Sequence, residues 1–144
     1  MRVEEALSWD EYSTDPRFRA KQPFRRGSRK QSCGDNIYFR TGPNTPWQQR
    51  DSFHSREDGS AAPGHIARDT GVSRVLISRQ FLYVGGNGPM LPDLHDAQGR
   101  SLCKTGIGHS KFDDPELIAA FVAWLESLGA SGFRGEPYEW LSLR

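Results

Sequence analysis

Residues 74–84 read RVLISRQFLYV and contain two short runs of strand-forming residues, which set the fold class. The first run, Arg74 to Ser78, places Val, Leu and Ile next to one another, and the second, Phe81 to Val84, includes two aromatic rings. β-branched and aromatic side chains favour pleated strands. The glycines at 85, 86 and 88 and a proline at 89 then indicate a turn. This stretch therefore predicts two β-strands.

The clearest single element lies further along, at residues 113–128. Asp113-Asp114-Pro115-Glu116 is typical of a helix start, because acids favour the N-terminus and proline is tolerated in the first turn. Gly129 provides a stop. Apolar residues recur at three- and four-residue spacing and predict an apolar face that packs on the sheet: Leu117, Ile118, Phe121, Trp124, Leu125 and Leu128.

The N-terminal half predicts short elements joined by loops. We expect a strand at residues 1–7, and a helix from Trp9 to about Ser13 that begins with the capping box of Ser8 and Glu11. Residues 34–40 predict another strand, whereas residues 16–33 show no periodicity and residues 47–71 read as an irregular loop. Together these patterns predict one α+β domain over residues 1–144. Its sheet is small, bent and mixed or antiparallel, and its C-terminal helix is amphipathic.

Composition excludes several classes of protein. Fifteen Gly and nine Pro among 144 residues exclude an all-helical bundle. No apolar run approaches the roughly 20 residues that cross a bilayer, and the first residues lack a signal-peptide pattern. We therefore expect a cytoplasmic protein with no membrane contact. Cys33 and Cys103 lie far apart and match no metal-ligand spacing, so we expect reduced thiols, no metal and no cofactor.

Charge is distributed unevenly although the net charge is only +1. Residues 16–34 contain seven basic residues and no acid, whereas residues 112–144 contain six acids and two bases. Such asymmetry indicates an anionic partner at the basic end. In this interpretation Arg26, Arg29 and Lys30 hold phosphates. The alternative is a basic loop whose charges are simply solvated.

Aromatic and polar residues near the basic segment complete the candidate nucleotide site. Basic side chains that track phosphates, with aromatic rings that stack on bases, are typical of single-strand and flipped-base binding. We expect Asp35 and Asn36 to bond a base edge, Tyr38 or Tyr83 to stack on it, and His54 or His109 to complete the pocket. Phe39 and Phe53 are further candidates for stacking or for the core. The alternative for each polar residue is a structural or surface role.

Several strings along the chain resemble the nucleotide-modification-associated domain family of the second type. The most specific are Gly34-Asp-Asn-Ile-Tyr38 and Val75-Leu-Ile-Ser78 followed by Phe81 and Tyr83; Ser52-Phe-His54 and Asp69-Thr70 also match. The resemblance runs essentially end to end. Members of the family usually carry a further N-terminal segment, so we expect this chain to correspond to a shortened form.

The resemblance implies association with systems that modify DNA bases or handle modified bases. The turn of Gly34 and Asp35 before a strand is also similar to PUA-like domains, which implies a partial barrel. We therefore expect a module that binds nucleic acid or a nucleotide, with modified DNA and DNA-modification enzymes as partners. The alternatives are an enzyme that uses Asp35, His54, Asp58 or His109 as acid and base, and a purely structural partner.

Overall fold

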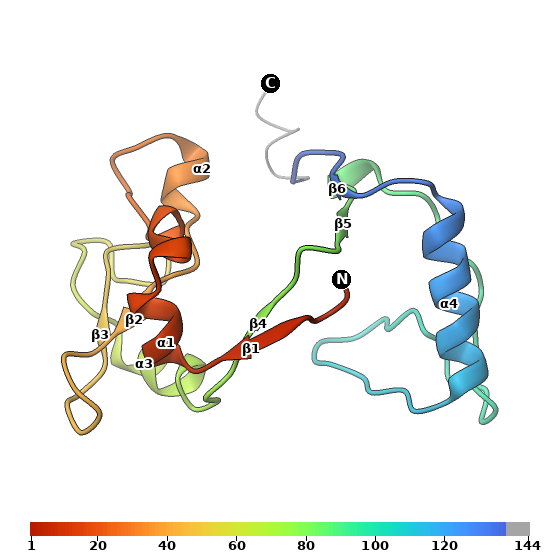
Figure 1. Ribbon diagram of the computed structural model, residues 1–144, viewed down its shortest axis with the longest axis horizontal. Coiled ribbons are helices and arrows are strands. Elements are labelled where there is room, and N and C mark those ends of the chain that lie inside the picture. Colours follow the sequence, from red (N-terminus) through yellow and green to blue (C-terminus); the bar gives the residue numbers. More distant parts are fainter. Residues whose placement is uncertain (138–144) are drawn as a thin grey trace. The chain divides into compact units, whose positions relative to one another are not determined.

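The computed structural model describes residues 1–137 and divides the chain into two compact units. The N-terminal unit is Arg2–Arg79, and the C-terminal unit contains the residues from Gln80 onward together with Met1. Figure 1 labels the helices and strands. Both element types occur among the described residues, so the fold is mixed α and β as predicted. One domain over residues 1–144 stays a prediction.

Two long-range strand pairs organise the N-terminal unit. Strand β1, Glu5–Leu7, pairs antiparallel with β4, Val75–Ile77, and Ala6 lies opposite Leu76. Figure 1 shows these two strands side by side. Strand β2, Tyr38–Phe39, pairs antiparallel with β3, Gln48–Gln49. The strands predicted near 1–7, 34–40 and 74–78 are therefore present, although each is shorter than expected.

Helix α1, Trp9–Thr14, begins and ends as its sequence predicts. The Ser8 hydroxyl accepts the backbone N–H of Glu11 at 3.2 Å, and the Glu11 carboxylate accepts the backbone N–H of Ser8 at 2.7 Å. These two bonds satisfy N–H groups that a helix start otherwise leaves free. Asp15 is extended and precedes Pro16, which ends the helix.

The basic segment is more ordered than its sequence indicates. It contains a 3-10 helix η1, Pro16–Lys21, and a short helix α2, Arg29–Ser32. The Asp15 carboxylate accepts the N–H of Arg17 at the start of η1, and Ser28 and Gln31 form a capping box around α2. The sequence of this segment shows no periodicity, yet two short helices form in it. Each of these short helices begins with a side-chain cap, and η1 also packs its Phe18 ring against Tyr12.

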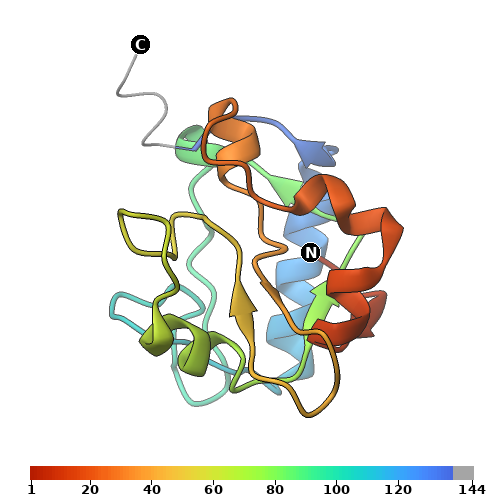
Figure 2. The same cartoon turned by 90° about the vertical axis from the view of Figure 1, so that its left-hand side faces the viewer.

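Residues 47–71 also contain structure where the sequence predicts a loop. Besides β3, they form helix α3, Pro63–Asp69. In Figure 2 this yellow-green helix lies near the lower end of the β2–β3 pair. Its N-terminus has proline in the first turn but no side-chain cap. The capping residue that usually signals a helix start is therefore missing, which explains why the sequence does not predict α3.

The core of the N-terminal unit is small and aromatic. Tyr12 and Tyr38 are 3% and 2% exposed. The Tyr12 ring centroid lies 4.5 Å from that of Phe18, and the Trp9 centroid lies 5.5 Å from that of Tyr38 in an edge-to-face arrangement. Aromatic pairs of this geometry stabilise a core beyond the area that they bury. Tyr38 is therefore a core residue, with consequences for its predicted role.

The C-terminal unit contains strand β5, Leu82–Tyr83, which pairs in parallel with β6, Gly132–Phe133. A short 3-10 helix η2, Gly85–Asn87, follows β5. With this parallel pair, the described residues hold three two-stranded sheets and no closed barrel. The sequence also predicts an extended tail after residue 132 with Tyr138 and Trp140 as anchors, and these two residues lie outside the described residues.

Helix α4, Pro115–Ser127, begins and ends close to the predicted positions. The Asp114 carboxylate accepts the backbone N–H of Glu116 at 2.9 Å and that of Leu117 at 3.2 Å. Gly129 follows the helix with a φ of 57°, in the left-handed region that glycine adopts without strain. Leu117 is buried, but Ile118 is 45% exposed, so the apolar face is narrower than predicted. That the helix packs on a sheet stays a prediction.

No described helix is long and apolar enough to span a membrane.

Candidate functional site

Three residues from two elements of the N-terminal unit, β3 and α3, hold His54. Its Nδ1 lies 3.2 Å from Oδ2 of Asp69, the last residue of α3. Its backbone carbonyl accepts a bond from Nε2 of Gln49 in β3 at 2.9 Å and another from Nδ1 of His65 in α3 at 2.7 Å. The imidazole and its backbone are therefore both positioned, while 47% of the side chain remains exposed.

Asp69 is the centre of this cluster. Besides His54, its carboxylate accepts the hydroxyl of Tyr38 at 2.6 Å and Nε of Arg68 at 2.8 Å. Burial by itself raises the pKa of the Asp69 carboxyl, but hydrogen bonds from the three donors outweigh burial and lower that pKa to about 2. Asp69 is therefore ionised at neutral pH and orients the imidazole beside it.

Tyr38 acts on this cluster through its hydroxyl alone. Its side chain is buried, which leaves no ring face on which a base could stack. Burial, and then the hydrogen bond to Asp69, raise the pKa of the Tyr38 hydroxyl. The hydroxyl therefore stays protonated and donates to the carboxylate. The stacking role predicted for Tyr38 has no exposed surface in this structure.

Phe53, which is open to solvent, and Arg25, whose side chain is 30% exposed, belong to the surroundings of the loop that carries His54. Phe53 directly precedes His54 in the chain and is 63% exposed. The guanidinium of Arg25 lies 5.8 Å from the Phe53 ring centroid, within cation–π range, and 3.3 Å from the Asp51 carboxylate. Arg25 thus connects the basic segment to the loop that carries His54. We name Arg25, Phe53 and His54 the loop surface.

The predicted phosphate-binding residues are exposed on and before α2. Arg26, Arg29 and Lys30 form no ion pair with any residue among 1–137. Their positive charge is therefore not neutralised by a described carboxylate. This arrangement is compatible with an anionic partner and equally with a solvated surface.

Asp35 and Asn36 lie on the other side of the basic segment, against α1 and η1. The Asp35 carboxylate accepts the Tyr12 hydroxyl at 2.6 Å and lies 3.6 Å from Nζ of Lys21. Asn36 is fully buried, and its amide group donates to the backbone carbonyls of Tyr12 and Phe18. Asn36 therefore ties η1 to α1 and has no exposed atom with which to bond a base edge.

The remaining two predicted residues belong to the C-terminal unit. Tyr83 in β5 is 38% exposed, with its ring centroid 5.7 Å from that of Phe133. His109 lies exposed in the loop before α4. Both residues belong to the unit that begins at Gln80, whereas His54 and Asp69 belong to the unit Arg2–Arg79.

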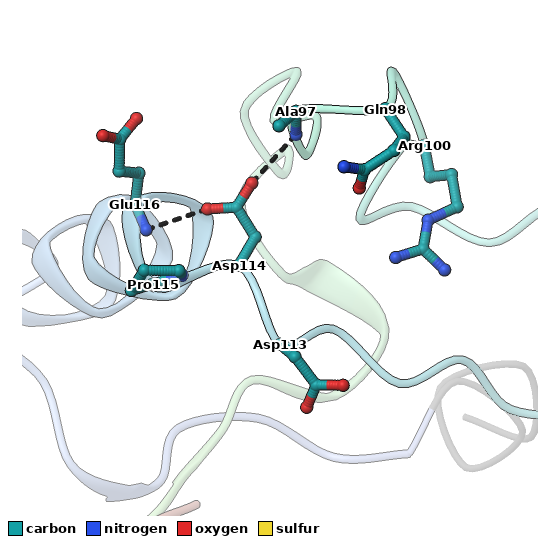
Figure 3. Close-up of a pocket in the computed structure, with 7 residues that line it drawn as sticks. All are labelled: Ala97, Gln98, Arg100, Asp113, Asp114, Pro115 and Glu116. Atoms are coloured by element: carbon teal, nitrogen blue, oxygen red, sulfur yellow. Dashed lines mark hydrogen bonds between the residues drawn. The ribbon is translucent and has the colours of Figure 1, made fainter.

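The C-terminal unit has a hollow of about 500 Å³ at the start of α4. Figure 3 shows Asp114 bonded to the backbone N–H groups of Glu116 and Ala97, with Asp113 and Arg100 nearby. Arg100 is already paired with the buried carboxylate of Asp96 at 2.6 Å. The carboxylates of Asp113, Asp114 and Glu116 line this hollow and make it unfavourable for phosphate.

Among residues 1–137, no group of three or more His, Cys, Asp and Glu side chains could hold a metal ion. The family model described as nucleotide modification associated domain 2 matches residues 1–144. The chain belongs to this family. Comparison with curated proteins and with solved structures finds no match.

The structure joins two strings of this nucleotide modification associated domain 2 that are separate in its sequence. Ser52-Phe53-His54 forms the loop, and Asp69 bonds its imidazole. Sequence reasoning considered both strings but did not place Asp69 beside His54, because they are fifteen positions apart. Gln49, His65 and Arg68 were not singled out as partners, and no local pattern marks them.

Proposed function

We propose that this domain binds nucleotide units of nucleic acid through the loop surface, in systems that modify DNA bases or handle modified bases. The observation that carries the proposal is the exposed Phe53 ring, which has the Arg25 guanidinium 5.8 Å from its centroid and is followed in the chain by the positioned His54. The family to which the chain belongs supports the context of nucleotide modification.

Each part of the loop surface has a role in binding. A base stacks on Phe53, because every base has an aromatic face and such stacking tolerates any sequence. Arg25 and the uncompensated Arg26, Arg29 and Lys30 attract the phosphates, and their contribution weakens as added salt reduces the gain from counterion release. Tyr38 supports this surface from the core through its bond to Asp69, whereas Asn36 ties η1 to α1. Tyr83 remains a second candidate for stacking, in the C-terminal unit.

The experiment is fluorescence anisotropy of short single- and double-stranded DNA, with and without a modified base, at two salt concentrations. Phe53→Leu keeps an apolar side chain but removes the aromatic face. We expect it to weaken single-strand binding by about 1–3 kcal/mol, or roughly five- to hundredfold. The matched control is Phe133→Leu, which alters a comparably exposed ring in the other unit. Equal affinity of wild type and Phe53→Leu would contradict the proposal.

A second candidate function is acid–base catalysis on a nucleotide or modified base. The pairing of His54 with ionised Asp69 favours it, because a carboxylate that holds one ring nitrogen leaves the other free to exchange a proton. This function predicts turnover that His54→Gln abolishes while oligonucleotide binding survives. Binding without turnover of any offered nucleotide would leave the domain as a binding module.

The finer fold proposal is a PUA-like partial barrel. What supports it is the turn at Gly34 and Asp35 that leads through a buried Ile37 into β2. The described residues hold three separate two-stranded sheets, so the proposal requires β2 to continue into a larger bent sheet. An experimental structure with such a continuous sheet would agree with the proposal, and one that keeps the three pairs separate would contradict it.

A further inference from the structure

Both histidines of the cluster are held in one tautomer. Nδ1 of His65 lies 2.7 Å from the backbone carbonyl of His54, and a carbonyl only accepts, so this nitrogen carries the proton. Nδ1 of His54 lies 3.2 Å from Oδ2 of Asp69. That carboxylate is ionised at neutral pH and also only accepts, so His54 Nδ1 donates as well.

The tautomer determines what His54 offers at the surface. A neutral imidazole with its proton on Nδ1 has a lone pair on Nε2, and that nitrogen is a pure hydrogen-bond acceptor. No residue in the described range 1–137 bonds Nε2 of His54. The side chain is 47% exposed and directly follows Phe53, the stacking ring of the proposed function. His54 therefore offers an unoccupied acceptor in the residue next to the proposed stacking ring.

We propose that Nε2 of His54 selects bases that carry an exocyclic amino group, at C6 of adenine or C4 of cytosine. This inference rests on the proposed function, since it requires a base stacked on Phe53. Thymine and guanine present a carbonyl oxygen at the equivalent position, which would face Nε2 acceptor to acceptor. Modified bases that keep one amino N–H remain ligands, and bases with a doubly alkylated amino group do not.

The neighbours of His54 hold its imidazole in the orientation and tautomer that this selection requires. Asp69 engages its Nδ1, and Tyr38 and Arg68 donate to that same carboxylate, so both hold the carboxylate in place. Gln49 and His65 bond the His54 backbone and fix the direction of the ring. For the imidazole to become a donor at Nε2 in its neutral form, it would have to give up the bond to Asp69. The acceptor is therefore built into the site.

The test uses the full chain and one single-stranded oligonucleotide in which a central base is adenine, purine without its amino group, or N6,N6-dimethyladenine. We expect adenine to bind roughly three- to tenfold more tightly than either analogue, the effect of one hydrogen bond. His54→Phe keeps an aromatic ring but removes the acceptor, and should abolish the difference. The matched control is His95→Phe, a histidine with a 42% exposed side chain and Asp93 at 3.6 Å from its Nδ1. It should preserve the difference.

A second measurement needs no variant. Long-range proton–nitrogen NMR correlations on the histidine-labelled wild type should show His54 and His65 protonated at Nδ1 at about pH 8, above the usual imidazole pKa. A proton on Nε2 of His54 would overturn the inference. Equal binding of adenine and purine, with binding still dependent on Phe53, would overturn the base selection alone. Absence of binding to every oligonucleotide would overturn the proposed function and this inference together.

Discussion

Replacing Asp69 with Asn should make the N-terminal unit less stable at neutral pH and change how its stability depends on acid. The carboxyl has an ordinary pKa of 3.8, and in the folded chain its three donors lower that pKa to about 2. One pKa unit corresponds to about 1.4 kcal/mol, so ionised Asp69 contributes about 2 kcal/mol to the free energy of unfolding. Its side chain is 21% exposed, so solvent screens this contribution only in part.

The sign follows from the lowered pKa. The folded state favours the charged carboxylate, so the stabilisation is fully present above the unfolded pKa and is lost as pH falls from about 4 toward about 2. The amide that replaces the carboxyl in Asp69→Asn does not titrate in this range. The difference in unfolding free energy between wild type and Asp69→Asn should therefore narrow by about 1 kcal/mol between about pH 6 and about pH 3.

Urea unfolding followed by circular dichroism at the two pH values measures both free energies. The control is Asp93→Asn, which removes the same charge from a side chain that is 89% exposed. It should change stability little at either pH, because exposed ion pairs contribute little. If the difference between wild type and Asp69→Asn were the same at both pH values, Asp69 would not be held ionised by its donors.

Three further changes test the caps and the basic segment. Ser8→Ala should cost about 1 kcal/mol in urea unfolding through loss of the α1 cap, whereas exposed Ser73→Ala should cost almost nothing. Asp114→Ala should lower the thermal unfolding midpoint, because the Asp114 carboxylate caps α4 and also accepts the backbone N–H of Ala97. An unchanged midpoint would mean that this cap contributes nothing to stability. DNA titrations at several salt concentrations give the slope of log affinity against log salt concentration. The double variant Arg29→Gln with Lys30→Gln should reduce this slope by about 1 for each phosphate that it no longer neutralises, whereas the control Arg74→Gln should leave the slope unchanged. Equal slopes for wild type and the double variant would show that Arg29 and Lys30 are solvated surface residues.

The sequence predicted elements well where a few neighbouring residues determine them. The α1 cap depends on Ser8 and Glu11, three positions apart, and the α4 cap depends on Asp114 and the amides just after it. The sequence did not predict α3, because that helix begins without a side-chain cap. It also missed α2, although Ser28 and Gln31 have the same spacing as the capping box that was recognised at α1.

The candidate site was predicted only in part. His54 was selected and is positioned at the loop surface, whereas Asn36 and Tyr38 were selected as ligand contacts and are buried. Both were selected because they are polar and lie close to the basic segment in the sequence. Their burial depends on how the chain packs, which the sequence does not show. Asp69 was noted only within the Asp69-Thr70 string and not as a partner of His54, because sequence carries no distance between side chains that meet across separate elements.

Composition and local patterning by themselves determined the mixed α and β class, the two capped helices and the concentration of positive charge before Gly34. These features depend on backbone preferences and on hydrogen bonds that span a few residues, so they can be predicted without knowledge of the fold. Only the tertiary structure decided that β1 pairs with β4, far along the chain, and that His54, Asp69 and Tyr38 share one cluster. The physical reason is that such contacts form only when chain closure and core packing bring distant segments together.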